Sequence, residues 1–271
     1  MNKYILHNSD FFIEKNFSIS INNRSFLYSD GFFETIKVIN SKCFNLPNHF
    51  QRIKETSNLF MCKFSYSYNK MESLLDSLIK RNNIIGGRIR LVFYRDAEGK
   101  YLPESNSMSF IGTIQISPND FSLNKDGLII GLFSDIRKNL NPFSNCKTTS
   151  AMVSVFGSIY AEKNNLDDCL ILNTNNNIIE GTHCNLFLVK DNQLYTPPLS
   201  EGCVNGTLRR FILSQFDVRQ KIITKSELKR MDEIFLTNAI QGVRWVKKCN
   251  QIEYYSNKFT EKVLNILNNN L

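Results

Sequence analysis

The sequence predicts an α/β (α+β) protein of two domains. Segments with strand and helix patterns alternate along the 271 residues, a length sufficient for two domains of ordinary size. Hydrophobic residues make up 42% of the chain, and 21 Phe and 10 Tyr supply large side chains for buried cores. The polar segment 117–120 closes the first run of elements. We therefore expect a small α+β domain over residues 1–117 and a larger α/β domain over residues 121–271.

The first domain is expected to contain strands, two helices and two more strands. Residues 31–39 are β-rich, and a turn at 40–41 leads to a short strand around 43–44. A helix is expected over 47–60, because Pro47 suits a first helical turn and apolar residues then recur at helical spacing. The remaining expected elements are a helix over 69–81 and strands over 88–95 and 107–116.

The second domain is expected to mix short strands with helices. A strand over 127–133 precedes a helix predicted from about Thr148 to Lys163. Turn residues then separate a series of short apolar segments. The expected strands are 167–173, 178–180, 185–190, 193–196, 232–237 and 241–246, and the expected helices are 208–214 and 258–268.

Charge and composition narrow the functional classes. The net charge of +8 could indicate nucleic acid as a partner, but Lys and Arg form runs no longer than pairs, and no reading motif is present. A basic nucleic-acid-binding module is kept as the alternative from another class. No stretch approaches a membrane span and the first residues lack an apolar signal core, so we expect a cytoplasmic protein without a membrane partner. Seven Cys without C-x-x-C spacing and three dispersed His predict neither a disulfide framework nor a metal site.

Lys147 is the residue around which we predict a chemical site. Taken alone it would be an ordinary lysine at the start of a helix, and three other features give it partners. Glu180 ends an apolar strand, where a carboxylate is costly unless a cation meets it; the alternative is a solvated turn residue. The turn G-C-V-N-G-T-L-R-R from Gly202 leads into a helix whose N–H groups would bind a phosphate. Arg52 is a further cation, for which a surface ion pair is the alternative role.

These features meet the requirements of pyridoxal 5′-phosphate. A lysine forms its Schiff base, a carboxylate keeps its pyridine nitrogen protonated, and an anion-binding turn holds its phosphate.

Several segments also resemble, in their residues and in their order along the chain, the class IV pyridoxal-phosphate aminotransferases, a family that includes aminodeoxychorismate lyase. They are Y-S-D-G-F-F-E-T-I-K-V, N-H-F-Q-R-I, the Lys147 loop, I-I-E-G-T-H-C-N-L-F-L-V, L-Y-T-P-P-L-x-x-G-C-V-N-G and D-E-I-F-L-T-N-A. The resemblance spans roughly residues 26–246. It implies the two-domain fold of the D-amino-acid aminotransferases, with the cofactor between the domains, and a homodimer whose active sites lie at the subunit interface.

The resemblance also implies the roles of individual residues. Lys147 would be the Schiff-base lysine and proton shuttle, Glu180 would meet the pyridine nitrogen, and Arg52 would contact the phosphate. Tyr28 and Phe33 match positions that line the substrate pocket, although core packing is the alternative role for Phe33. The further cofactor contacts would be Asn185, Gly206, Thr207, Leu208, Asn238 and Ala239, with Thr207, Leu208 and Ala239 offering backbone N–H groups.

Departures from the family pattern bear on the reaction. Leu208 replaces a threonine common in the aminotransferases, and T-N-A at 237–239 is similar to the lyase, whereas Glu34 is typical of aminotransferases. The T-T-S-A-M that follows Lys147 matches neither group.

The expected activity is that of 4-amino-4-deoxychorismate lyase, which releases pyruvate and 4-aminobenzoate in folate biosynthesis. The alternative is an aminotransferase acting on branched-chain or D-amino acids. The substrate expected for the lyase is a small anionic amine that needs cations, for which Arg90 and Arg95 are candidates; a solvated strand face is the other interpretation of both.

Overall fold

The computed structural model describes residues 3–270 and consists of two compact units. Unit 1 comprises the chain up to Asp120 together with Cys146–Ser150, and unit 2 comprises Phe121–Asn145 and the chain from Ala151 onward. The expected domain over 121–271 included Cys146–Ser150, and this short segment instead belongs to unit 1. Each unit is described by itself below.

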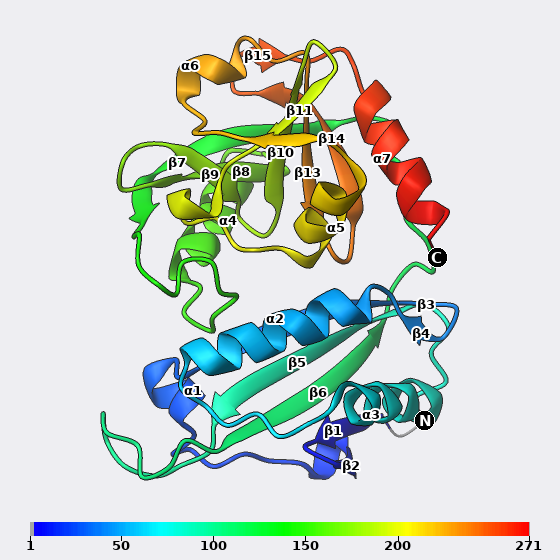
Figure 1. Ribbon diagram of the computed structural model, residues 1–271, viewed down its shortest axis with the longest axis vertical. Coiled ribbons are helices and arrows are strands. Elements are labelled where there is room, and N and C mark those ends of the chain that lie inside the picture. Colours follow the sequence, from blue (N-terminus) through cyan, green and yellow to red (C-terminus); the bar gives the residue numbers. More distant parts are fainter. Residues whose placement is uncertain (1–2, 271) are drawn as a thin grey trace. The chain divides into compact units, whose positions relative to one another are not determined.

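The sheet of unit 1 has six strands in the order β2-β1-β6-β5-β3-β4, joined by antiparallel pairs (Figure 1). The strands are β1 (Tyr4–His7), β2 (Asp10–Ile13), β3 (Gly31–Ile39), β4 (Lys42–Cys43), β5 (Gly87–Arg95) and β6 (Met108–Ile116). The long strands β3, β5 and β6 confirm the predicted segments. No element was predicted before residue 31, where β1 and β2 precede a 3-10 helix, η1 (Glu14–Asn16), and a short helix, α1 (Arg24–Tyr28).

Two helices, α2 (Leu46–Leu59) and α3 (Tyr68–Arg81), pack against this sheet (Figure 1). Pro47 lies in the first turn of α2 as predicted, and the Ser67 side chain caps α3 by accepting a hydrogen bond from the Lys70 N–H. The apolar face of α3 is buried and consists of Met71, Leu74, Leu75, Leu78 and Ile79. Burying one large apolar side chain contributes about 1.5–3 kcal/mol to folding.

Unit 2 is built on a nine-stranded sheet in the order β12-β11-β10-β13-β14-β7-β8-β9, with β15 paired to β14. Strand β9 pairs with both β8 and β10, so the six strands from β10 to β9 form a closed ring. The strands are β7 (Leu128–Lys138), β8 (Asp168–Asn173), β9 (Ile178–Gly181), β10 (Asn185–Lys190), β11 (Gln193–Thr196), β12 (Val218–Gln220), β13 (Glu233–Asn238), β14 (Gly242–Cys249) and β15 (Ile252–Glu253).

The helices of unit 2 surround this ring of strands (Figure 1). They are α4 (Met152–Lys163), the 3-10 helix η2 (Leu199–Glu201), α5 (Thr207–Gln215), α6 (Lys225–Leu228) and α7 (Lys258–Asn268). The bounds of α7 are those predicted from the sequence. The fully buried core includes Leu170, Leu186, Ile234, Leu236 and Val246.

The helix predicted from about Thr148 begins instead at Met152, and Thr148 lies outside it. Thr148 forms an antiparallel bridge with Phe32. The Phe33 N–H donates to the Lys147 carbonyl at 2.9 Å, and the Thr149 N–H donates to the Gly31 carbonyl at 3.0 Å. The prediction was wrong here because hydrogen bonds to a distant strand satisfy the backbone that local periodicity assigned to a helix.

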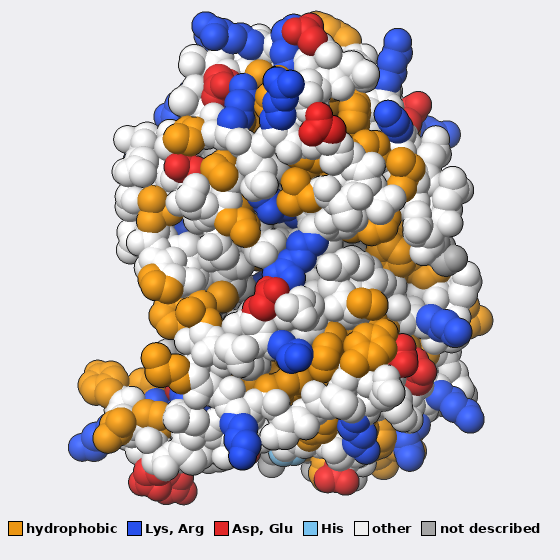
Figure 2. Space-filling view, viewed as in Figure 1, with side chains coloured by type: hydrophobic (Ala, Val, Ile, Leu, Met, Phe, Trp, Pro, Cys, Tyr) orange, Lys and Arg blue, Asp and Glu red, His pale blue; other side chains and the backbone are white. Residues whose placement is uncertain are grey.

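The surface carries its positive charge in a dispersed way. On the face shown in Figure 2, Lys and Arg side chains are scattered among neutral and apolar ones. Among residues 3–270, no helix has the length and apolar character needed to cross a membrane.

Candidate active site

Three of the predicted site residues meet in unit 1, around the ring of Phe33. The Lys147 Nζ lies 4.6 Å from the ring centre, and the guanidinium carbon of Arg90 lies 4.0 Å from it. Arg90 comes to this place because β3 pairs with β5, with Thr35 opposite Arg90 and Phe33 opposite Val92. Residues two apart on a strand point to the same face, so Phe33 and Arg90 share one face of the sheet. The outcome is two cations on one aromatic ring, an arrangement suited to an anionic ligand.

The backbone holds Lys147 in this group. Its carbonyl accepts the Phe33 N–H, so the lysine is attached to the strand that supplies the aromatic ring. Two bonds of the Thr149 hydroxyl, to the carbonyls of Ser29 at 3.0 Å and Gly31 at 3.1 Å, secure the following residues. Lys147 is partly buried. The side chain therefore starts from a fixed backbone, as a catalytic group requires.

Arg52 lies in a buried ion cluster on α2. Its Nε donates to Glu34 Oε1 at 2.7 Å and one terminal nitrogen donates to Glu34 Oε2 at 2.6 Å, while the His49 Nδ1 lies 2.6 Å from the same Oε2. All three side chains are buried. Burial on its own would raise the pKa of Glu34, but the charge of Arg52 and the hydrogen bond from His49 lower it to about 2. Arg52 was predicted as a phosphate contact, and the structure gives it this bidentate carboxylate partner.

Two other predicted substrate residues lie outside the Phe33 group. Arg95 donates to Asp30 Oδ2 at 2.9 Å, to the Phe60 carbonyl at 2.7 Å and to Asn106. It follows Arg90 by an odd number of residues on β5, so its side chain starts on the opposite face. Tyr28 ends α1, exposed at 40%, and its ring centre is 5.7 Å from that of Tyr101. The structure gives Arg95 a role in holding loops together.

Glu180 is the centre of a second group, in unit 2. It is buried on β9, as the sequence suggested, and its Oε1 accepts a hydrogen bond from the Lys138 Nζ at 2.5 Å. Its Oε2 accepts the Val204 N–H at 2.7 Å. The predicted need for a cation is thus met by Lys138, which was not predicted because the expected strand ended at residue 133. Strand β7 continues to Lys138, where it pairs again with β8 at Asn173.

Strand pairing places the other predicted cofactor contacts of unit 2 around Glu180. Asn185, the first residue of β10, is opposite Glu180 on one side and opposite Thr237 on the other. Asn238 and Ala239 follow Thr237 at the end of β13. The Asn185 amide donates to the Val204 carbonyl at 2.7 Å, in the turn that precedes α5. Residues from three separate parts of the sequence therefore gather at one end of the sheet.

The start of α5 supplies an anion-binding element for this group. Gly206 is the N-cap residue and has no side chain to accept a bond from the first turn, which begins with Thr207 and Leu208. The N-terminus of a helix favours a phosphate through its N–H groups and its partial positive charge. The hydroxyl of the buried Thr237 has no hydrogen-bond partner among the described residues. This hydroxyl can therefore form a hydrogen bond with a ligand.

Comparison with known proteins identifies the family to which the chain belongs. The sequence profile of the family described as amino-transferase class IV matches residues 31–249. The chain belongs to this family. It is 24% identical over 254 residues to the D-alanine aminotransferase of Staphylococcus epidermidis, which covers 89% of this chain and 87% of the relative. It is also 26% identical over 265 residues to the aminodeoxychorismate lyase of Bacillus subtilis, with 92% and 87% covered.

The fold agrees with this membership. A crystal structure of the branched-chain aminotransferase from Thermoproteus uzoniensis matches with a TM-score of 0.90 at 19% identity, covering 98% of this chain and 94% of that one. The predicted family and fold class are confirmed. The protein is a pyridoxal-phosphate enzyme of class IV, which confirms the predicted cofactor as well.

The residues present fit this cofactor. Lys147 supplies an amine on a fixed backbone, Glu180 supplies a buried carboxylate already paired with a cation, and the α5 N-terminus supplies N–H groups for a phosphate. Lys147 belongs to unit 1, whereas Glu180 and the α5 N-terminus belong to unit 2, and each group has the chemistry that its predicted role requires.

Replacing Gly206 with alanine is expected to weaken cofactor binding at least tenfold. A Cβ at this position would lie 1.9 Å from Asn185 Oδ1, so the buried asparagine would have to move from the Val204 carbonyl. Such overpacking costs about 1–3 kcal/mol, which corresponds to about one to two powers of ten in affinity. Titration of the apoenzyme with pyridoxal phosphate measures the change. Ser214→Ala, at the exposed end of the same helix, is the control, and equal affinity of Gly206→Ala and this control would contradict the assignment.

Proposed function

We propose that the enzyme is a 4-amino-4-deoxychorismate lyase, which releases pyruvate and 4-aminobenzoate. The observation that carries this proposal is the pair of cations on the Phe33 ring: Arg90 beside Lys147. A substrate with two carboxylates and an aromatising ring requires a cation and an apolar surface near the catalytic lysine, and Arg90 and Phe33 are of these kinds.

The phosphate-binding turn supports the same choice. Leu208 and Ala239 stand where many aminotransferases of the family carry hydroxyl side chains, so these two positions offer backbone N–H groups. Leu208 is buried, and its side chain packs in the core of unit 2. The similarity to the lyase of Bacillus subtilis is of the same order as that to the aminotransferases, and it leaves the reaction to be decided by such positions.

The residues of the chain would act as follows. Pyridoxal phosphate, when bound, supplies an electron sink for the charge left on carbon after a proton is removed. Glu180, held by Lys138 and the Val204 N–H, keeps the pyridine nitrogen protonated so that this sink stays effective. Lys147 would hold the cofactor, and its amine would take the proton from the amine-bearing carbon of the substrate. Loss of that proton lets the substrate ring aromatise as enolpyruvate leaves.

One observation favours the alternative, an aminotransferase acting on branched-chain or D-amino acids. Glu34 is typical of the aminotransferases, and here it is the centre of the buried cluster with His49 and Arg52. Lys147 and Glu180 would do the same work in both reactions, so they do not discriminate between them.

A substrate screen on the holoenzyme tests the proposal. The expected result is pyruvate release from aminodeoxychorismate with the cofactor spectrum restored after each turnover. If D-alanine or a branched-chain amino acid instead converts the enzyme to its pyridoxamine form, and a 2-oxo acid restores it, the lyase proposal is wrong and the aminotransferase is correct.

Arg90→Met is expected to lower kcat/KM for aminodeoxychorismate by about 10- to 100-fold. A hydrogen bond from a charged group to a carboxylate contributes about 1.5–3 kcal/mol, and methionine keeps much of the packing on Phe33. The loss is expected mainly in KM, because the carboxylate is bound in both the ground state and the transition state. Arg88→Met, on the same strand and exposed, is the matched control. Unchanged kinetics of the Arg90 variant would remove Arg90 from the substrate site.

The proposal includes a homodimer, which the family resemblance implies, and a cytoplasmic location. Sedimentation of the purified holoenzyme measures the oligomeric state.

A further inference from the structure

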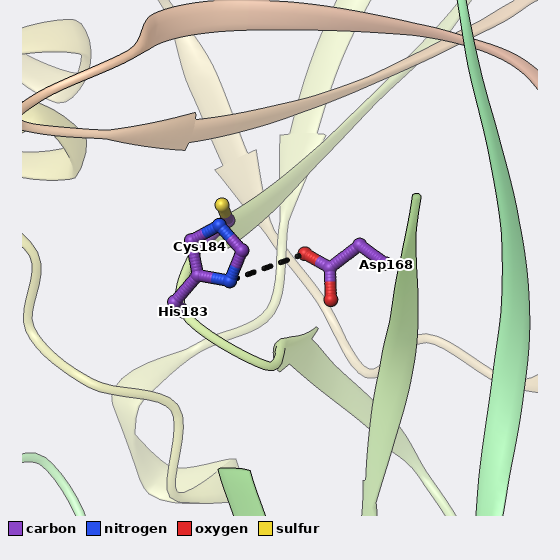
Figure 3. Close-up of side chains that lie close together, drawn as sticks. All are labelled: Asp168, His183 and Cys184. Carbon is purple, nitrogen blue, oxygen red and sulfur yellow. Dashed lines mark ion pairs between the residues drawn. The ribbon is translucent and has the colours of Figure 1, made fainter. Parts of the chain in front are cut away.

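Unit 2 contains a cluster of three side chains of the types that bind metals: Asp168, His183 and Cys184. Asp168 is the first residue of β8, and His183 and Cys184 follow the end of β9. Because β8 and β9 pair with Leu170 opposite Gly181, the turn after Gly181 lies beside Asp168. One ligand atom from each side chain lies within 4.8 Å of the other two, and Figure 3 shows the His183 ring turned toward the Asp168 carboxylate with Cys184 beside the ring.

The carboxylate of Asp168 is only half satisfied. The side chain is 3% exposed, and its Oδ1 accepts the N–H of Cys169 at 2.7 Å, the N–H of Thr182 at 3.1 Å and the Thr182 hydroxyl at 2.6 Å. Its Oδ2 is buried and has no hydrogen-bond partner among the described residues. A buried carboxylate oxygen without a donor is costly, so this atom indicates a missing cationic partner.

His183 does not fill that place by itself. Its Nδ1 lies 3.8 Å from Asp168 Oδ2, beyond hydrogen-bond distance, and 2.9 Å from the Thr182 hydroxyl. About half of the His183 side chain is exposed, so solvent and ions reach the cluster. The Cys184 Sγ is buried and accepts a hydrogen bond from the Asn238 amide at 3.1 Å, which holds the sulfur in place within the cluster.

We propose that Asp168 Oδ2, a ring nitrogen of His183 and Cys184 Sγ bind one Zn²⁺-class ion. Nitrogen, sulfur and carboxylate oxygen are the ligands that Zn²⁺ takes in proteins, at about 2.0–2.3 Å. Ligand atoms around such an ion are about 3.3–3.8 Å apart, so the cluster must contract slightly when the ion binds. Three protein ligands leave a fourth position for water, as in catalytic zinc sites.

The site also explains why the sequence predicted no metal. Asp168 is separated from His183 by two strands and a turn, and no C-x-x-C or H-x-x-H spacing links the ligands. Only the pairing of β8 with β9 brings them together. The ion would stabilise the turn between β9 and β10, which begins with Thr182 and ends at Cys184.

The test uses the metal-free holoenzyme and Co²⁺ as a spectroscopic probe for Zn²⁺. Wild-type enzyme is expected to bind one Co²⁺ per chain, with the visible bands of a tetrahedral site at wavelengths longer than the cofactor band, and Zn²⁺ should displace it. His183→Gln and Cys184→Ser are each expected to weaken binding at least 100-fold, because losing a ligand exceeds the 10- to 100-fold loss typical of outer partners. Asp168→Asn is expected to do the same while retaining the bonds to Oδ1.

Two matched controls separate this site from other thiols and imidazoles. His7→Gln and Cys43→Ser change the same residue types in unit 1 and are expected to bind Co²⁺ as the wild type does. Circular dichroism is used to check that each variant is folded. Because about half of the His183 side chain is exposed, His183→Gln is the substitution expected to disturb the fold least. Absence of Co²⁺ binding by the wild type, or binding that persists in both His183→Gln and Cys184→Ser, would overturn the proposal.

Discussion

Lys147→Ala is expected to lower turnover of the amine substrate by a factor of about 10⁴ or more. The variant loses the amine that we propose carries the cofactor and moves the proton, and a positioned base alone contributes about 10²–10⁴-fold. Steady-state pyruvate release from aminodeoxychorismate, or transamination if that is the reaction, measures the loss. The visible absorbance of the attached cofactor is expected to disappear with it.

The control for this prediction is Lys54→Ala, an exposed lysine on α2. It is expected to retain both the absorbance and the turnover of the wild type. Retention of the covalent cofactor band in Lys147→Ala would show that another lysine carries the cofactor, and the assignment of Lys147 would be withdrawn. Absorbance that depends on Lys147 would equally exclude a nucleic-acid-binding module, the alternative that the net charge suggested.

Glu34→Gln is expected to lower the free energy of unfolding by about 3–5 kcal/mol. The change removes the carboxylate from the buried cluster and leaves the Arg52 charge without its partner. Breaking one side of a buried pair costs this much because the remaining charge stays buried and uncompensated. Urea unfolding followed by circular dichroism measures it. Glu14→Gln, which breaks the exposed pair with Lys3 at 2.6 Å, is the control and is expected to cost less than about 1 kcal/mol.

The same carboxylate makes a defined contribution to the pH dependence of stability. Burial opposes the charged form of Glu34, yet Arg52 and His49 lower its pKa from 4.5 to about 2. In the unfolded chain the carboxyl binds its proton near pH 4.5, before the folded chain does. The stability contributed by Glu34 is therefore complete above pH 4.5 and is lost as the pH falls toward 2, by about 3 kcal/mol in all. Glu34→Gln should flatten the unfolding free energy in this window, and an unchanged acid slope would contradict the assignment.

Local patterns were sufficient for most elements. Residues 31–39, 69–81 and 258–268 fold as their periodicity predicts, because the spacing of their apolar residues matches the repeat of the element whose apolar side is buried in the protein. The glycine turn before a helix was also predicted, and Gly206 is the N-cap of α5; its phosphate-binding role stays a prediction.

Local patterns failed where a distant segment supplied the hydrogen bonds. Residues 147–149 pair with β3 instead of leading directly into α4, and β7 runs to Lys138 beyond its apolar part. Elements before residue 31 were not predicted, since β1 and β2 are short and pair chiefly with each other and with β6.

The sequence by itself determined the family, the cofactor and the lysine and carboxylate expected to serve it, because these depend on residue types in a fixed order. Only the tertiary structure decided which side chains meet. It gave Glu180 its partner Lys138, gave Arg52 its partner Glu34, turned Arg95 away from Phe33 and joined Asp168 to His183 and Cys184. The physical reason is that a hydrogen bond or ion pair acts over a few ångströms, and strand register, which depends on the whole sheet, determines which residues come that close.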